Sequence, residues 1–338
     1  MVKAKYWEYS SKFVGEPKLS NFKLVEEDLR ELKDEEFLAE AIFLSVDPYQ
    51  QVYMNFYNFP TGIVMIGGQV AKVIDSKNEQ FPTGCTIYGM FGWRTHTVVN
   101  LIMHTEYPPY ILPDFGSTLP ASLGLGLLGM PGNTAYFGFL EICRPKPDET
   151  VVISGAAGAV GSTVGQIAKI KGCRVIGIAG SDEKCKWLID ELGFDGAINY
   201  KTADIDAELK SKAPNGVDCY FDNVGGKISS IVLQNMNLFG RISVCGSISN
   251  YNNLHPDSVP EPLPEQQTTI LFKQLTQQGF VVYRWKEQWL EGINQLLEWV
   301  KDGKIKYRET IYEGFEKQPE AFIGMLRGEN IGKAIVKI

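Results

Sequence analysis

Three glycines are the residues whose spacing most directly indicates chemistry. Residues 151–153 form a short β-branched run, which is typical of a buried strand. Gly155, Gly158 and Gly161 follow, and a helical pattern of apolar residues then continues to Ile170. A strand, a tight glycine turn and a helix place free backbone N–H groups at a helix N-terminus, where a phosphate anion binds. The segment therefore predicts a nucleotide cofactor.

The turn departs at one position from the dinucleotide-binding pattern G-x-G-x-x-G, because Ala156 occupies the first glycine position. Gly155 supplies the tight turn instead, Gly158 lets the pyrophosphate approach the backbone, and Gly161 lets the helix pack closely on the strand. A small-residue turn of any α/β domain is the alternative, and the flanking strand and helix favour the dinucleotide site. The predicted phosphate-binding residues are Gly155, Ala156, Gly158, Ala159, Val160 and Gly161.

The next strand indicates which dinucleotide is bound. Residues 174–178 are predicted to form it, and Gly180 and Ser181 follow where an NAD site has a carboxylate for the ribose 2′-hydroxyl. Ser181 suits a helix N-cap, and the two carboxylates after it suit the first helical turn. Lys184 can reach a 2′-phosphate, the alternative being an ordinary solvated helix lysine. The pattern favours NADP(H).

Metal-dependent and hydrolytic chemistry are not supported by the sequence. It contains three histidines, His96, His104 and His255, and none of its six cysteines forms a Cys-x-x-Cys pair. Zinc sites need such ligands in clusters, and no Gly-x-Ser-x-Gly nucleophile motif occurs. We therefore expect no metal and no Ser–His–Asp triad.

Composition narrows the class of protein further. The chain has 338 residues, 44% of them hydrophobic and 22% charged, with a formal net charge of −7. These values predict a globular protein of two domains without a basic surface for nucleic acid. The apolar runs are too short to cross a bilayer, and the N-terminus lacks a signal-peptide core. Scattered cysteines fit a reducing compartment, so we expect a cytoplasmic protein with no membrane segment.

Two fold types follow one another along the chain. Residues 1–126 contain short strand patterns separated by turns, at 37–44, 68–74 and 95–99, with no helical periodicity before Ala121. They predict a partly closed antiparallel β domain. Residues 303–338 return to short strands with one helix near 319–326, and we expect this tail to complete the first domain.

Residues 127–302 alternate strand and helix, which predicts an α/β, doubly wound parallel sheet. A proline-rich loop at 256–264 is expected to border the active site. The predicted strands are 151–154, 174–178, 218–221, 241–245 and 280–283, and the predicted helices include 183–192, 229–237 and 286–300.

Together with the glycine turn, many short segments resemble the prostaglandin reductase, or leukotriene 12-hydroxydehydrogenase, family of the zinc-free medium-chain dehydrogenase/reductase superfamily. The resemblance runs nearly end to end. It implies a Rossmann-type cofactor domain, a GroES-like substrate domain and a homodimer joined through edge strands of the cofactor domain. The segments are Val46–Tyr49, Gly129–Gly132, Thr134–Tyr136, Ala156–Gly161, Gly180–Lys184, Asn199–Lys201, Cys219–Gly226, Phe280–Trp285 and Gly332–Val336.

The resemblance also implies an activity, the NADPH-dependent reduction of carbon–carbon double bonds conjugated to a carbonyl group. This class includes alkenal and enone reduction and 15-oxoprostaglandin 13-reduction. Such chemistry asks little of the protein, because the cofactor provides the hydride and a neutral hydrogen-bond donor stabilises the enolate oxygen. Tyr251 would be this donor. Quinone reduction by the same layout, and a non-catalytic cofactor-binding role, remain alternatives.

Other site residues are implied by the resemblance alone. Tyr49 and Phe272 would line the substrate site, and Lys184 and Tyr200 would surround the 2′-phosphate. Taken without the family, each position has a structural alternative, such as a half-buried aromatic residue or a turn asparagine. The remaining implied cofactor-binding residues are Ser181, Asn223, Cys245, Phe280, Val281, Val282 and Asn330.

Four positions depart from the family pattern. Relatives commonly have Met-Arg where this chain has Gln50 and Gln51, and tyrosine where it has Phe272; Asn133 replaces an apolar residue. The pocket is therefore expected to have lost one positive charge and one hydroxyl group. This change favours short uncharged alkenals and enones over fatty-acid carboxylates.

Overall fold

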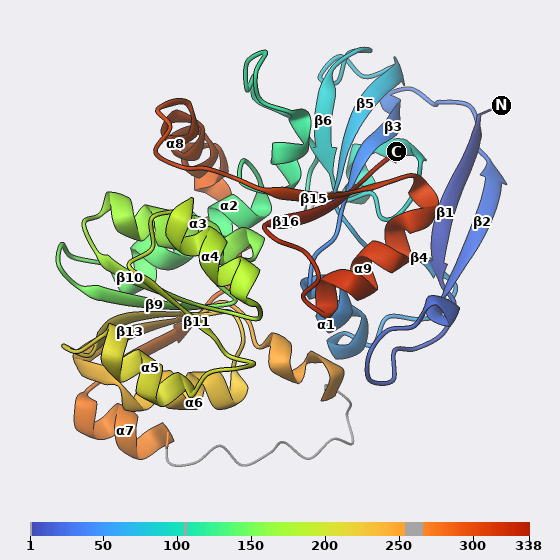
Figure 1. The fold of residues 1–338 in the computed structure, drawn as a ribbon. Helices are drawn as coiled ribbons and strands as arrows, with labels where there is room; N and C mark the ends of the chain where they lie inside the picture. Colours follow the sequence, from blue (N-terminus) through green and yellow to red (C-terminus); the bar gives the residue numbers. More distant parts are fainter. Residues whose placement is uncertain (1, 105–106, 254–265) are drawn as a thin grey trace. The chain divides into compact units, whose positions relative to one another are not determined.

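The protein folds into two compact units, seen in a computed structural model that describes residues 2–104, 107–253 and 266–338 (Figure 1). His255 and the proline-rich loop at 256–264 lie outside the described residues. One unit comprises Met1–Leu125, Asn252–Pro256 and Glu309–Ile338, and the other comprises Gly126–Tyr251 and Asp257–Arg308.

The second unit is built on a six-stranded sheet in which every pair of neighbours is parallel. The strand order is β11-β10-β9-β12-β13-β14, which is the 3-2-1-4-5-6 order of doubly wound dinucleotide-binding folds. The predicted fold class is confirmed. The strands are β9 (Thr150–Ser154), β10 (Arg174–Ala179), β11 (Gly196–Asn199), β12 (Val217–Asp222), β13 (Met236–Val244) and β14 (Thr276–Gly279).

Helices alternate with these strands, as the sequence pattern predicts (Figure 1). The β-branched residues 151–153 are fully buried between the helical layers, which explains why β9 is apolar throughout its length. The helices are α2 (Met130–Phe137), continued by a π-helical turn, α3 (Ala159–Ile170), α4 (Asp182–Asp190), α5 (Ile205–Lys212), α6 (Gly226–Gln234), α7 (Gln266–Lys273) and α8 (Trp289–Lys301).

The strand predicted at 280–283 is wrong. The edge strand β14 ends at Gly279, and a 3₁₀ helix begins at Val282. The apolar run was misleading because its side chains pack in the core without forming a strand. The ring of Phe280 covers Gly138, where a Cβ atom would lie 2.2 Å from it, and it meets the Trp285 ring at a centroid distance of 5.5 Å.

The first unit contains a seven-stranded and a three-stranded sheet, and all their strand pairs are antiparallel except β15 with β16. The C-terminal tail contributes β15, α9 and β16 to this unit. The strands are β1 (Lys3–Tyr9), β2 (Phe22–Asp28), β3 (Glu36–Ser45), β4 (Ile63–Val64), β5 (Gln69–Ser76), β6 (Thr86–Gly89), β7 (His96–Asn100), β8 (Tyr110–Ile111), β15 (Glu309–Glu313) and β16 (Lys333–Lys337); the helices are α1 (Tyr49–Phe56) and α9 (Gln318–Leu326).

Helix α1 contradicts the expectation that no helix precedes Ala121. Its buried side chains are Gln50, Gln51 and Met54, so two of the three core-facing positions are polar. An apolar stripe is the signal from which a helix is predicted, and α1 lacks one. The glutamine side chains are held instead by hydrogen bonds to other segments of the chain, such as the 2.8 Å bond from Gln50 Nε2 to the Ile66 carbonyl.

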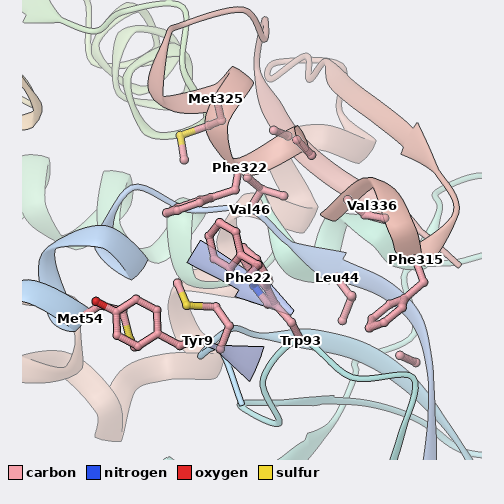
Figure 2. Packing of buried hydrophobic residues seen from close by; sticks show 14 of the residues in the cluster. Tyr9, Phe22, Leu44, Val46, Met54, Trp93, Phe315, Phe322, Met325 and Val336 are labelled. Carbon is pink, nitrogen blue, oxygen red and sulfur yellow. The ribbon is translucent and has the colours of Figure 1, made fainter. Parts of the chain in front are cut away.

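An aromatic core fixes α1 within the first unit (Figure 2). Met54 is fully buried in this cluster together with Trp93 and Tyr9. The Trp93 ring meets the rings of Phe22 and Phe322 at centroid distances of 5.2 and 5.4 Å. Because Phe322 lies on α9, the tail and the N-terminal strands share one core, against which α1 presents its buried face.

No helix within the described ranges is long and apolar enough to cross a membrane.

Candidate cofactor and active site

Two positions of the turn after β9 favour glycine, one because of its backbone conformation and the other because of the space available. Gly155 has a φ of +60°, a conformation that favours glycine. A Cβ atom at Gly161 would lie 2.5 Å from the Gly155 carbonyl oxygen. Ala156 is fully buried, and its N–H donates to the Ile178 carbonyl at 3.0 Å. The turn is thus fastened to β10, which holds its shape before any ligand binds.

The turn leads directly into α3. Gly158 is the N-cap, with an extended backbone and no side-chain cap. The first N–H groups of a helix have no acceptor within the helix, and no side chain caps those of Ala159, Val160 and Gly161. With the helix dipole, this arrangement suits a pyrophosphate. The residues present therefore fit a dinucleotide.

The segment after β10 is arranged as the sequence predicts. Ser181 is the N-cap of α4, and its hydroxyl accepts a hydrogen bond from the Lys184 N–H at 3.2 Å. The nearby carboxylate of Asp182 accepts a 2.7 Å hydrogen bond from Asn199 Nδ2. That carboxylate therefore has a partner within the protein, and the strand tip offers hydroxyl and amine groups to a ligand.

Two lysines lie near the tip of β10. The Tyr200 ring covers Gly180, where a Cβ atom would lie 3.0 Å from the ring. Lys201 Nζ lies 6.0 Å from the centroid of the same ring. Burial lowers the pKa of Lys184, and the positive charge of Lys201 lowers it further. Two neighbouring cations suit a phosphate dianion.

Lys201 was not among the residues predicted for the site. Its signal in the sequence was its place beside Tyr200 in the segment Asn199–Lys201. An isolated lysine after a strand is usually a solvated one, and only the structure shows the charge of Lys201 acting on Lys184.

Asn223 is held against the glycine turn. Its side-chain Nδ2 donates to the Ser154 carbonyl at 2.7 Å, and its backbone N–H donates to the Ser154 hydroxyl at 3.0 Å. Gly155 lies beside it, since a Cβ atom there would be 3.4 Å from the Asn223 Cβ. The structure therefore brings Asn223 to the phosphate-binding turn, through a serine that sequence reasoning did not single out.

Tyr251 and Cys245 lie after the end of β13. The Tyr251 hydroxyl accepts a 3.2 Å hydrogen bond from the Ser247 N–H, and a Cβ atom at Gly246 would lie 2.8 Å from that hydroxyl oxygen. Burial is the main cause that raises the pKa of Tyr251 above its usual value, and burial raises the pKa of Cys245 to about 12. Both groups are therefore neutral near pH 7, and Cys245 is no thiolate nucleophile.

The other residues predicted for this unit make no hydrogen bond or ring contact with the glycine turn in the part of the chain that the structure describes. Phe280 packs its ring against those of Phe221 and Trp285, Val282 is buried, and the Val281 side chain between them is 58% exposed. Phe272 lies on α7 with 74% of its surface exposed. Asn133 donates from Nδ2 to the Trp289 carbonyl at 2.9 Å, which joins α2 to α8.

The remaining predicted residues belong to the first unit. Tyr49 begins α1, and its hydroxyl lies 3.8 Å from the Met90 sulfur. Asn330 Nδ2 donates to the Gly332 carbonyl at 2.7 Å. Gln51 is buried and donates from Nε2 to the Gly15 carbonyl at 3.3 Å. The roles of these residues toward cofactor or substrate stay predictions.

Within the ranges that the structure describes, no group of three or more His, Cys, Asp or Glu side chains could hold a metal ion. His96 Nε2 lies 3.4 Å from a Glu40 carboxylate oxygen. His104 meets the ring of Phe91 edge-on at a centroid distance of 5.4 Å.

Two protein families match the chain. Residues 5–105 match the family described as the N-terminal domain of oxidoreductase, and residues 159–299 match the family described as zinc-binding dehydrogenase. Prostaglandin reductase 1 of Bos taurus is 52% identical over the full length of both chains. The NADPH-dependent curcumin reductase of Escherichia coli is 38% identical, covering 98% of this chain and 96% of the relative.

A solved structure agrees with this assignment. The structure of CurA from Vibrio vulnificus in complex with NADPH superimposes with a TM-score of 0.89. The two sequences are 39% identical, and the match covers 98% of each chain. Family match, full-length identity and fold all point the same way. The chain belongs to the prostaglandin reductase family of the zinc-free medium-chain dehydrogenase/reductase superfamily.

Proposed function

We propose that the protein is an NADPH-dependent reductase of α,β-unsaturated ketones and aldehydes. Bound NADPH supplies a hydride, which adds to the β-carbon of the substrate while negative charge develops on the carbonyl oxygen. The enzyme reduces the carbon–carbon double bond and leaves the carbonyl group intact. The two neighbouring lysines at the tip of β10 and the uncapped N-terminus of α3 support the choice of NADPH.

The observation that most directly supports this function is the state of the Tyr251 hydroxyl. It accepts a hydrogen bond from the Ser247 N–H, so its own hydrogen remains available for donation. Burial raises its pKa, which keeps the phenol protonated. A neutral donor aimed at a developing enolate oxygen lowers the barrier without any acid–base pair. Tyr251 is the catalytic residue of this proposal.

The remaining predicted residues divide into two groups. Ser181, Lys184 and Tyr200 bind the 2′-phosphate end of the cofactor, and Lys201 joins them. Cys245, which follows β13, borders its nicotinamide end, and Asn223, which follows β12, lies near its ribose or nicotinamide. Val281 and Asn330 remain assigned to the cofactor, with Phe280 and Val282 shaping the wall behind it.

We assign short uncharged alkenals and enones as the preferred substrates. Gln51 is buried and neutral, with its Nε2 committed to the Gly15 carbonyl and to Asn252 Oδ1 at 2.8 Å. It therefore provides no positive charge for a substrate carboxylate. Tyr49 and Phe272 contribute apolar surface. Carboxylated substrates, 15-oxoprostaglandins among them, are predicted to be turned over no better than their methyl esters.

A cytoplasmic homodimer completes the proposal. All six cysteines are free, as expected in a reducing compartment. Among the described strands, β14 pairs only with β13, so its other edge can pair with β14 of a second copy. The substrate domain would comprise residues 1–126 and 303–338, and the cofactor domain residues 127–302. Light scattering tests the dimer, and cell fractionation tests the cytoplasmic location.

A substrate panel tests the function itself. The protein is mixed with NADPH and, in turn, with enones, alkenals, carboxylated eicosanoids, their methyl esters and quinones, and the fall in NADPH absorbance is followed. Turnover of uncharged enones and alkenals is expected. Turnover of quinones alone would contradict the proposal, and a marked preference for free acids over methyl esters would contradict the substrate assignment.

A further inference from the structure

The carboxylate of Asp222 is buried at the carboxyl end of β12, where the residue is 5% exposed. Three hydroxyl groups donate to it, those of Ser154 at 2.9 Å, Tyr220 at 2.8 Å and Ser229. Two backbone N–H groups of the following turn donate at 3.0 and 2.9 Å. All five partners are uncharged groups that donate hydrogen bonds.

This acid has no cationic partner among the described residues, since none of their ion pairs involves Asp222. The Tyr220 hydroxyl stays protonated and can donate to it, because burial and the charge of Asp222 raise the pKa of Tyr220 far above its usual value. Hydrogen bonds from neutral groups hold a buried carboxylate in place without cancelling its charge. No ion pair among the described residues therefore balances the negative charge of Asp222.

The residue also joins the ends of three strands. The Asp222 carbonyl accepts hydrogen bonds from the N–H groups of Cys245 and Gly246, at 2.8 and 3.1 Å. Ser154, which donates to its carboxylate, accepts from the Asn223 N–H. The segments after β9, β12 and β13 are thereby joined through one residue, by its carboxylate and by its main-chain carbonyl. In doubly wound folds the dinucleotide binds at the carboxyl ends of these strands.

The charge acts on the residues assigned to the nicotinamide end. After burial, the charge of Asp222 is the second cause that raises the pKa of Cys245, and it contributes to the raised pKa of Tyr251. A negative potential that disfavours thiolate and phenolate favours a cation at the same place. Hydride donation creates such a cation, because the C4–H bond of the dihydronicotinamide breaks, both electrons leave with the hydrogen, and the ring keeps one positive charge.

We propose that Asp222 is a positioning residue whose buried charge favours the oxidised, positively charged nicotinamide over the reduced, neutral one. This inference rests on the proposed use of NADPH as hydride donor. It adds to that function a contribution of the protein itself to the driving force for hydride transfer. A carboxylate with a purely structural role would affect the binding of both cofactor forms alike, so the preference between the two forms separates the roles.

The test compares cofactor affinities of the Asp222→Asn variant in the absence of any substrate. Dissociation constants for NADPH and NADP⁺ are measured by fluorescence titration and calorimetry. The variant is expected to bind NADP⁺ about tenfold more weakly relative to NADPH, as for a unit charge acting over roughly 10 Å at an effective dielectric constant of about 20. Its kcat for an enone should fall, with little change in KM.

Asp218→Asn is the matched control. Asp218 lies on the same strand, and its carboxylate accepts hydrogen bonds from the Thr150 N–H and from Asn237 Nδ2, both at 2.8 Å. The variant removes the same charge at the opposite end of β12. It is expected to leave the ratio of the two dissociation constants unchanged.

A second variant keeps the test decisive if Asp222→Asn fails to fold. Tyr220→Phe removes one donor and retains the charge, so the preference should shift two- to threefold toward NADP⁺. Equal changes for both cofactor forms in Asp222→Asn, or no shift toward NADP⁺ in Tyr220→Phe, would overturn the inference. The cofactor affinities are measured without substrate, so they test this inference alone. A failure of the protein to reduce enones would count against the proposed function only.

Discussion

At the scale of single residues, the candidate site relies on main-chain hydrogen bonds to place its side chains. Tyr251 is aimed by the Ser247 N–H, and Asn223 by the Ser154 carbonyl. Ser181 is oriented by the N–H of Lys184. Such contacts depend on the loop backbone and survive substitution of neighbouring side chains. Each side chain can therefore be removed singly and its role measured.

Tyr251→Phe keeps the aromatic ring and removes one donor. Loss of an oxyanion donor costs about 2.7–4 kcal/mol, and a cofactor ribose hydroxyl can share the role, so a fall of up to about a hundredfold in kcat and in kcat/KM is expected. NADPH affinity should barely change. Steady-state kinetics with one enone and NADPH titration check this.

Tyr136→Phe is the control, since the Tyr136 ring packs against the rings of Phe137 and Trp299. It should leave kcat unchanged. An unchanged kcat with a raised KM in Tyr251→Phe would assign Tyr251 to substrate binding in both the ground and transition states.

Lys184→Ala tests the phosphate site. A charge-assisted hydrogen bond contributes about 1.5–3 kcal/mol, so NADPH binding should weaken by roughly tenfold to a hundredfold, while NADH binding changes little. Lys186→Ala is the matched control on the same helix, because Lys186 pairs with Asp190 on an exposed face. Titration of both cofactors decides the matter, and equal losses for NADPH and NADH would remove Lys184 from the phosphate site.

At the scale of elements, the β9–turn–α3 unit combines a rigid backbone with a ligand site. Its glycines differ in what a methyl group would meet. At Gly161 a Cβ atom would lie 2.5 Å from the Gly155 carbonyl oxygen, whereas at Gly158 the distance to the same oxygen would be 3.3 Å. One position is thus limited by the fold, and the other mainly by the approach of a pyrophosphate.

Gly161→Ala and Gly158→Ala should therefore separate stability from binding. The first is expected to destabilise the protein without cofactor by about 1–3 kcal/mol and to weaken NADPH. The second should leave that stability within about 1 kcal/mol and weaken NADPH at least tenfold. Denaturant unfolding and cofactor titration measure both. A Gly158→Ala protein that binds NADPH normally would contradict the phosphate assignment.

The elements that the sequence predicted are those with a repeating apolar signal. A β-branched run before glycines identifies β9, and apolar periodicity after them identifies α3. Helix α1 was missed because its buried face contains Gln50 and Gln51. The edge strand β14 was missed because its residues, Thr276–Gly279, are polar and mostly exposed. Both elements are determined by tertiary contacts, which the local pattern does not show.

The candidate site divides in the same way. The glycine turn, Ser181 and the absence of a competing carboxylate could be predicted from local sequence. Tyr251 and Asn223 were assigned only through family resemblance, since a loop tyrosine or asparagine has no distinctive local pattern. Lys201 and Asp222 emerged only from the structure, because their effects depend on charges and hydrogen bonds between segments far apart in the chain.

At the scale of the whole molecule, the enzyme uses NADPH, and its reaction is predicted to need no metal. Prolonged chelation should therefore leave both kcat and the Tm of the holoenzyme unchanged. A structural or catalytic zinc would contribute folding energy or polarise the carbonyl, so its removal would lower one or both. Thermal unfolding and activity are compared before and after dialysis against chelator, and elemental analysis showing stoichiometric zinc would contradict the assignment.

The position of the transferred hydrogen tests the central claim most directly. The protein is incubated with an enone and NADPH deuterated at C4 of the nicotinamide, and the product is examined by NMR and mass spectrometry. The proposed reaction predicts a saturated ketone with one deuterium on the former β-carbon, the hydrogen at the α-carbon coming from solvent. Deuterium on the carbinol carbon of an alcohol, or no transfer to any enone, would contradict the account.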